Sequence, residues 1–353
     1  MELDVKIEKE LRNFTLRADF SLRDEVFALL GASGCGKSMT LKCIAGLERP
    51  DRGRIVLDGR VLFDSEQGID LSPQERRVGY LFQNFALFPN MTIAENIRFV
   101  ARGTRQQREA RVRENLARFD LTELGNAYPM ELSGGQQQRA AFARILASDA
   151  KILLLDEPFA AIDAKVRKEL RGWLRQTIHR LGITSIFVTH DQDEAVEVAD
   201  DIIIMQHGHV EQAGTPLAIY QSPRTPFVAD FVGTSVHVPD YTVFKGFGDG
   251  RGASGGEGII RPEFLEIGAD AAEMRLPLAS EDGIVRGVYF RGDCLQVDVE
   301  VKGQLLRGRR SLEKRPLHEG DVAKVFIHRI YTFADGGTRI LENAAKREEP
   351  VVI

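Results

Sequence analysis

The stretch from Gly31 to Ser38 has the residue types and the spacing that bind a triphosphate. It reads Gly31-Ala32-Ser33-Gly34-Cys35-Gly36-Lys37-Ser38 and fits the phosphate-binding pattern G-x-x-x-x-G-K-[ST]. An apolar run, Val26–Leu30, precedes it, and a helix-compatible segment begins at Met39. Glycines let the backbone fold closely around phosphates, and a helix N-terminus favours anions. We therefore predict a nucleotide site over residues 31–39, in which Lys37 reaches the β- and γ-phosphates and Ser38 binds Mg²⁺.

Two carboxylates follow a second apolar run and could complete the chemistry. Ile152–Leu155 has the composition of a buried strand, and Asp156 and Glu157 come directly after it. Phosphoryl transfer needs a carboxylate near the metal, and Asp156 suits that role. Glu157, one residue later, points elsewhere and could act as the general base for an attacking water. The alternative is a solvated acidic turn after a core strand.

A third motif, Leu132-Ser133-Gly134-Gly135-Gln136, precedes a helical stretch over 137–146. Ser133 and the N–H groups after it offer a further anion site at a helix start, or a simple helix cap. Together with the two motifs above, this segment makes the chain resemble the ATP-binding subunit of ABC transporters, almost continuously over residues 1–235.

The resemblance implies that two copies of the chain face each other head to tail. ATP held by one copy, together with its Mg²⁺, would then be completed as a site by the other copy, whose Ser133, Gly134, Gly135, Gln136 and Asp163 contact the ATP. It also implies that Gln83 touches Mg²⁺ and the attacking water, and that His190 contacts the γ-phosphate. The local alternatives are a polar strand end for Gln83, a helix cap for Asp163 and a structural role for His190.

Two features of the nucleotide site are less typical. The family usually stacks an aromatic side chain on adenine, and Phe14 is the aromatic residue near that position. It could equally be a core residue of an early strand, so the adenine contact stays unassigned. Cys35, inside the phosphate-binding loop, is read as a small tolerated residue rather than as a redox switch.

Length and pattern predict two domains. The chain has 353 residues, more than one ordinary domain. Strand-like runs and helical patterns alternate up to about residue 235, and short alternating runs follow. The predicted fold is an α/β P-loop ABC ATPase domain over 1–235, with a helical subdomain over about 86–150, and a small all-β OB-like domain over 236–353. The expected strands are Val26–Leu30, Val78–Phe82, Ile152–Asp156, Ser185–Thr189, Ile202–Met205, Gly283–Phe290, Cys294–Val301, Gln304–Gly308 and Val322–His328, and the expected helices include Arg105–Phe119 and Ala164–Leu181.

Composition narrows the function classes. The net charge of −5 gives no sign of a nucleic-acid-binding surface, and no run of apolar residues is long enough to span a bilayer. The three cysteines have no metal-like spacing and are expected to be reduced thiols.

Two segments favour an importer among ABC proteins. Residues 82–92 resemble the importer version of the region after Gln83, whose apolar side chains would receive a short helix of a permease. Core packing is the alternative for Phe85 and Phe88. The part over about residues 236–341 resembles the accessory β domain of importers for sugars, sulfate, molybdate and iron, on Ile260–Glu263 and His328–Phe333.

The resemblance thus implies an ATPase homodimer, peripheral at the cytoplasmic face of a bacterial or archaeal membrane. Its partners would be integral membrane permease subunits and, indirectly, an extracytoplasmic solute-binding protein, with no nucleic acid. The long segment over 60–73 resembles molybdate importers, so we expect molybdate as the solute. Import of sulfate, tungstate, Fe(III) or polyols is the alternative, and a soluble ABC ATPase acting on nucleic acid or ribosomes is the alternative from a different class.

Overall fold

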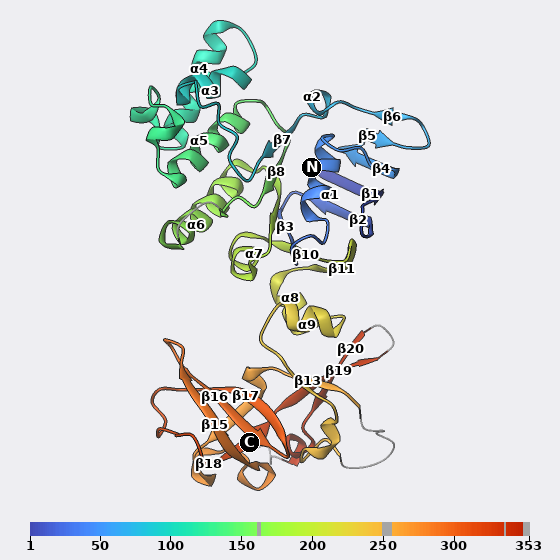
Figure 1. The fold of residues 1–353 in the computed structure, drawn as a ribbon, viewed down its shortest axis with the longest axis vertical. Helices are drawn as coiled ribbons and strands as arrows, with labels where there is room; N and C mark the ends of the chain where they lie inside the picture. The colour runs from blue at the N-terminus through green and yellow to red at the C-terminus, as the bar shows by residue number, and fades with distance from the viewer. Residues whose placement is uncertain (161–163, 249–255, 335–336, 349–353) are drawn as a thin grey trace. The chain divides into compact units, whose positions relative to one another are not determined.

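The computed structural model describes residues 1–160, 164–248, 256–334 and 337–348. Internal contacts divide the chain into two compact units, Met1–Leu217 and Ala218–Ile353, which are drawn in Figure 1. The predicted domain boundary at 235/236 and the predicted helical subdomain remain predictions about how the chain is organised.

In the described part of the first unit, eleven strands form one sheet in the order β6-β5-β4-β1-β2-β11-β10-β3-β9-β8-β7. Strands β10, β3, β9, β8 and β7 are parallel neighbours, and the N-terminal strands pair antiparallel. The strands are β1 Glu2–Glu10, β2 Thr15–Arg23, β3 Val26–Gly31, β4 Arg52–Leu57, β5 Arg60–Asp64, β6 Ile69–Asp70, β7 Val78–Leu81, β8 Ile152–Asp156, β9 Thr184–Thr189, β10 Asp201–Gln206 and β11 His209–Gly214.

The parallel strands are the ones that the apolar runs predicted. β3 and β9 are buried along their whole length, which is why their sequences are almost continuously apolar. β7 ends at Leu81, one residue before the predicted end, so Phe82 and Gln83 lie in the connection that follows.

Some helices of this unit pack on the sheet, and three others form a separate cluster beyond strand β7. α3, α4 and α5 contact one another and lie together in Figure 1. The helices of this unit are α1 Lys37–Ala45, α2 Pro73–Arg76, α3 Ile93–Val100, α4 Arg105–Arg118, α5 Gly134–Leu146, α6 Ala164–Leu181 and α7 Gln192–Val198, and α8 Pro216–Gln221 and α9 Pro226–Phe231 follow. The predicted helix Arg105–Phe119 is α4, one residue shorter, and Ala164–Leu181 is α6.

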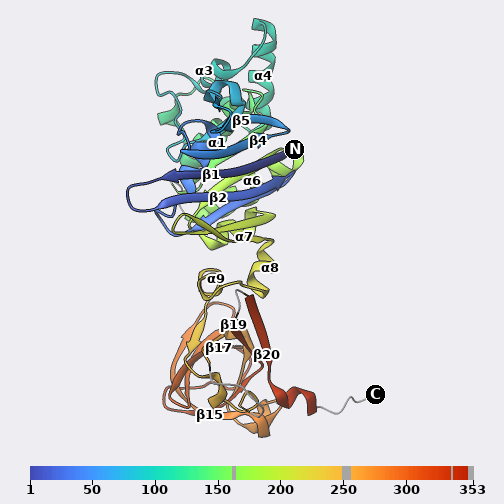
Figure 2. The same ribbon diagram turned by 90° about the vertical axis from the view of Figure 1, so that its right-hand side faces the viewer.

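The second unit is built from two sheets (Figure 2). Among its described residues, five strands pair in the order β14-β18-β15-β16-β17 and four in the order β12-β13-β19-β20. Their bounds are β12 Val236–Val238, β13 Gly258–Ile260, β14 Leu265–Gly268, β15 Glu281–Phe290, β16 Leu295–Val301, β17 Gln304–Arg310, β18 Val322–Ile327, β19 Arg329–Ala334 and β20 Gly337–Glu342.

The five-stranded sheet curls until its two end strands meet. A Cβ added to Gly308 of β17 would lie 2.6 Å from Ile267 Cδ1 of β14, so the two edges are in contact without pairing. Inward-facing residues such as Val285, Val299 and Leu306 fill the interior. This curled five-stranded sheet confirms the predicted all-β OB-like fold of the C-terminal part.

No helix in the described segments is long and apolar enough to cross a membrane.

Candidate functional site

The phosphate-binding loop lies between β3 and α1, where the motif requires it. Gly36 is the N-cap of α1, and its φ of 107° favours glycine. Gly31 has no room for a side chain, because an added Cβ would lie 2.3 Å from the Met205 carbonyl oxygen. Lys37 and Ser38 therefore occupy the first turn of α1, whose free N–H groups face the loop.

Lys37 is held inside the loop. Its side chain is buried, and its Nζ donates to the carbonyl oxygens of Gly31 at 2.7 Å and Ala32 at 2.9 Å. Cys35 is buried beside it, and burial raises the pKa of the Cys35 thiol. A protonated, buried thiol is unreactive, in keeping with a small residue tolerated in the loop. Met39 is half-buried and packs against the core of the sheet.

The two predicted magnesium ligands on α1 and β8 are in contact. Ser38 Oγ donates to Asp156 Oδ1 at 2.6 Å, although 118 positions separate the residues in sequence. A hydroxyl and a carboxylate are the oxygen donors that Mg²⁺ takes from proteins. The donor set therefore fits Mg²⁺.

Glu157 contacts two of the other predicted catalytic side chains, Gln83 and His190. Gln83 Nε2 donates to Glu157 Oε2 at 3.0 Å, and His190 Nδ1 lies 3.5 Å from Glu157 Oε1. Glu157 has a φ of 46°, in the left-handed region of backbone conformation. This conformation costs free energy for a residue other than glycine, and such strained residues cluster at functional sites. These residues follow β7, β8 and β9, whose carboxyl ends share one edge of the sheet, together with the phosphate-binding loop after β3.

The Ser133 motif starts α5 rather than preceding it. Ser133 is the N-cap: its Oγ accepts from the Gln136 backbone N–H at 3.4 Å, and Gln136 Oε1 accepts from the Ser133 N–H at 2.9 Å. Gly134 and Gly135 are therefore helical. No described contact joins this motif to the phosphate-binding loop of the same chain. Asp163 lies outside the described residues.

Phe14 lies beside the phosphate-binding loop. It is half-buried, packs against the core of the sheet, and comes within 3.6 Å of a Cβ added to Gly36. The packing fits the core alternative, and the adenine contact stays unassigned.

A cavity of about 370 Å³ lies next to the edge strand β7. We call it the apolar cavity; its walls are Val78, Gly79, Tyr80, Phe82, Ala86, Phe88, Val100, Arg144, Ile145 and Ser148. Phe88 also contacts the ring of exposed Phe99, with centroids 4.9 Å apart. Phe85, in contrast, is buried and does not line the cavity, so for this residue the core alternative is the one observed.

Two polar side chains hold the segment that borders the cavity. Arg144 donates to the carbonyl oxygens of Phe85 at 3.1 Å and Ala86 at 2.6 Å, two residues with left-handed backbone. Asn96 is fully buried; its Nδ2 donates to three carbonyl oxygens between Phe88 and Thr92, and its Oδ1 accepts from the Phe88 N–H. Sequence reasoning missed both residues, because nothing local marks their distant partners.

Tyr80 was missed as well. Its hydroxyl donates to Asp156 Oδ2 at 2.9 Å. Burial, followed by the charge of Asp156, raises the pKa of the Tyr80 phenol, so it remains a donor. The only sequence signal is a tyrosine in an otherwise apolar strand.

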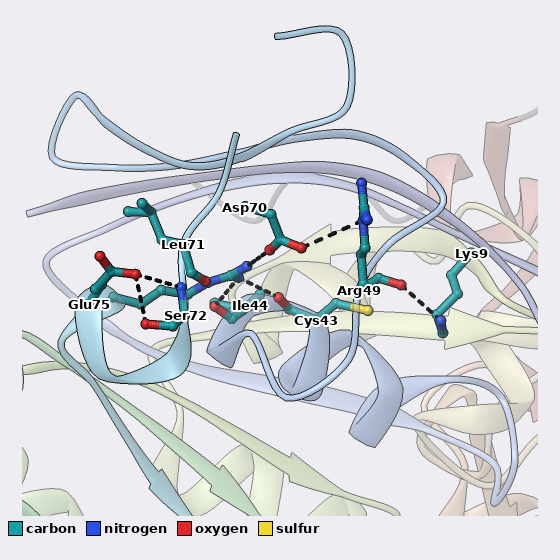
Figure 3. Close-up of polar contacts among 9 residues, drawn as sticks. Lys9, Cys43, Ile44, Arg49, Asp70, Leu71, Ser72 and Glu75 are labelled. Atoms are coloured by element: carbon teal, nitrogen blue, oxygen red, sulfur yellow. Dashed lines mark hydrogen bonds and ion pairs between the residues drawn. The ribbon is translucent and has the colours of Figure 1, made fainter. Parts of the chain in front are cut away.

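Arg76 fixes the far end of α1. Its buried guanidinium donates to the carbonyl oxygens of Cys43, Ile44 and Leu71 and to Asp70 Oδ1, at 2.7 to 3.0 Å. Figure 3 shows these acceptors around α1 and the loop after β6, with Arg49 on the other side of Asp70. The segment over 60–73 thus contributes two of the acceptors of Arg76, Asp70 and Leu71. From the sequence alone, this segment is expected to indicate the type of importer.

The comparisons with known proteins agree with this geometry. A family model described as "ABC transporter" matches residues 17–160. A sulfate/thiosulfate import ATP-binding protein of Acinetobacter baylyi is 39% identical over 363 residues, covering 95% of this chain and 99% of the relative. A sulfate/thiosulfate import ATP-binding protein of Synechococcus elongatus is 45% identical over 279 residues, covering 77% of this chain and 79% of the relative.

A solved structure matches the first part of the fold. It is described as a dimeric post-hydrolysis state of the ATP-binding cassette MJ0796 bound to ADP and Pi. Its TM-score is 0.50 at 30% identity, and the match covers 61% of this chain and 98% of that one.

These relatives correct one expectation. They are named for sulfate and thiosulfate, so they favour the alternative over molybdate, which the segment over 60–73 had suggested. With relatives matched along nearly its whole length, the chain belongs to the ATP-binding subunits of ABC importers, in the oxyanion branch that contains the sulfate/thiosulfate type.

Proposed function

We propose that this ATPase powers the import of sulfate or thiosulfate. The observation that carries the proposal is a likeness to sulfate/thiosulfate import proteins that extends through both units of the chain. ATPase subunits do not bind the transported solute along its path, so the residues of the nucleotide site carry no information on it.

In this proposal ATP binds to residues 31–39. Lys37 exchanges its carbonyl partners for the β- and γ-phosphates, and the N–H groups at the start of α1 face the anion. Glu157 is the general base for the attacking water, held between Gln83 and His190. This chemistry is mainly positioning and electrostatic stabilisation.

Ser38, Asp156 and Gln83 are proposed to hold Mg²⁺. The ion supplies charge neutralisation on the phosphates when it is bound. The contact between Ser38 and Asp156 supports two of these assignments, because both oxygens already lie side by side.

A second copy of the chain completes each site in this proposal. Ser133, Gly134, Gly135 and Gln136 contact ATP held by the partner copy, and Asp163 supports that site. The exposed position of Ser133 at the N-terminus of α5 supports this arrangement, since a helix N-terminus favours an anion.

The apolar cavity is proposed to receive a short helix of the permease. Phe82, Phe88 and the neighbouring Phe99 are large apolar side chains that remain exposed, as expected of a docking site. The ATPase would then be peripheral at the cytoplasmic face of the membrane, with a solute-binding protein acting from the other side.

Replacing Glu157 tests the catalytic assignment. Glu157→Gln keeps the hydrogen bond to Gln83 geometrically possible but removes the base, so steady-state hydrolysis should fall by a factor of about 10²–10⁴. An ATP-bound dimer should accumulate in size-exclusion chromatography. Glu66→Gln, at an exposed position, is the matched control. Unchanged hydrolysis by Glu157→Gln would remove Glu157 from the role of base.

The solute is tested with the intact importer in proteoliposomes. Labelled sulfate should accumulate inside when ATP is present, and the ATPase rate should rise with the sulfate-loaded binding protein. Uptake of molybdate without uptake of sulfate would overturn the proposed solute and leave the ATPase assignment intact.

A further inference from the structure

Tyr80 is placed by strand register within reach of Asp156. Tyr80 of β7 pairs with Leu154 of the parallel strand β8, and Asp156 is two residues further along that strand. Residues two apart on a strand share a face of the sheet, so the Tyr80 and Asp156 side chains lie on the same face. The hydroxyl therefore meets Asp156 Oδ2 at 2.9 Å.

The Asp156 carboxylate is held at both oxygens. Ser38 Oγ donates to Oδ1 and Tyr80 donates to Oδ2. Two donors on opposite oxygens fix the rotation of the carboxylate, and Ser38 alone would leave the second oxygen free to turn. Outer partners of this kind orient metal ligands.

The same tyrosine forms part of the wall of the apolar cavity. Its ring contacts the ring of Phe82, with centroids 4.6 Å apart, and both residues line the cavity. The Tyr80 ring thus packs on Phe82 of the cavity wall and on the core of the sheet, and its hydroxyl bonds to a proposed metal ligand.

We propose that Tyr80 is a positioning residue that orients Asp156 for the metal and links that carboxylate to the apolar cavity. The proposal rests on the proposed function, because it takes Asp156 as a metal ligand. A segment that enters the cavity and moves the Tyr80 ring also moves the hydroxyl, and so changes how firmly Asp156 is held.

Phenylalanine separates the hydrogen bond from the packing. Tyr80→Phe keeps the ring and its contact with Phe82, and loses only the donor to Asp156. The matched control is Tyr331→Phe in the second unit, where a buried tyrosine donates to the Gln221 carbonyl oxygen at 3.0 Å. Both variants lose one phenol hydroxyl.

The test is metal binding by the full chain in the presence of ADP, with Mn²⁺ as the probe and electron paramagnetic resonance as the readout. Tyr80→Phe should bind Mn²⁺ about tenfold more weakly, at the low end of the range for lost outer partners. ADP binding in EDTA should be unchanged, which shows that the nucleotide site is folded. Tyr331→Phe should bind Mn²⁺ as the unaltered chain does.

A double-mutant cycle tests the link to the cavity. Val100→Trp places a large ring in the cavity wall and should change Mn²⁺ affinity several-fold when Tyr80 is present, and much less in Tyr80→Phe. Equal effects in both backgrounds, or none, would overturn the link.

The remaining outcomes are distinct. Mn²⁺ affinity unchanged by Tyr80→Phe, or lowered equally by Tyr331→Phe, would overturn the positioning role while leaving the proposed function standing. An unaltered chain that binds no Mn²⁺ with ADP would overturn the proposed magnesium site of the ATPase, and this inference with it.

Discussion

Removing the guanidinium of Arg76 should destabilise the first unit without touching the nucleotide site. Arg76→Met keeps an unbranched buried side chain and removes all four hydrogen bonds of the guanidinium. Three of them go to neutral carbonyl oxygens, those of Cys43, Ile44 and Leu71. At about 1 kcal/mol each, their loss amounts to about 3 kcal/mol.

The fourth bond should count for less. Asp70 is 35% exposed and also lies 3.5 Å from Arg49, so it keeps solvent and a second cation when Arg76 is gone. Exposed ion pairs contribute about 1 kcal/mol or less. Asp70→Asn is therefore the control, since it removes the ion pair and leaves the three carbonyl bonds in place.

Differential scanning calorimetry of the full chain measures the effect. The transition of the first unit is the one that ADP with Mg²⁺ shifts upward. A loss of about 3 kcal/mol in a unit of this size corresponds to a decrease in melting temperature of about 6–12 °C. An Arg76→Met variant with the melting temperature of the unaltered chain would contradict this prediction. So would an Asp70→Asn variant whose melting temperature decreases as much as that of Arg76→Met.

Two further substitutions have expected outcomes. Asn96→Ala removes four hydrogen bonds to the backbone between Phe88 and Thr92. At about 1 kcal/mol each, the free energy of unfolding should fall by about 4 kcal/mol, and limited proteolysis should cut this segment faster. Asn84→Ala, at an exposed position, should change neither quantity. Burial, and then Lys346, lowers the pKa of His328, so the folded second unit resists protonation of this imidazole. The free energy of unfolding of the second unit should therefore be greatest above about pH 6.5 and decrease as the pH falls below that value. Urea unfolding should show a weaker dependence of this free energy on pH in His328→Gln. An equally steep dependence in the variant would assign the decrease to other groups.

The sequence predicted the elements that are apolar throughout and the site residues that belong to compact motifs. β3, β8 and β9 are buried on both faces, so their composition alone identifies them. The phosphate-binding loop, Asp156 and Glu157 lie at the ends of these strands, and their positions followed from strand order in parallel sheets.

The residues that hold these motifs in place were not predictable in the same way. Arg76 contacts α1 across more than 30 positions, and Arg144 contacts Phe85 across 59. Such partners depend on which helix packs against which strand, and composition does not specify that. The antiparallel strands β1 and β2 were likewise missed, since their alternating polar residues resemble an exposed surface segment.

The length of α5 has a mechanical consequence. The helix has 13 residues, which at 1.5 Å per residue makes a stiff rod of about 20 Å. One end is the Ser133 cap, and the other carries Arg144 and also Ile145, which packs so closely on Gly79 of β7 that no side chain fits there. A tilt of about 5° at one end of a rod of this length displaces the other by nearly 2 Å.

A stiff helix transmits a displacement from either end to the other. If a nucleotide held by a second copy shifts the Ser133 end, the cavity wall at Arg144 shifts with it, and an occupant of the cavity shifts the Ser133 end in return. Thermodynamic linkage then requires the occupant to change nucleotide affinity by the same factor by which the nucleotide changes the affinity for the occupant.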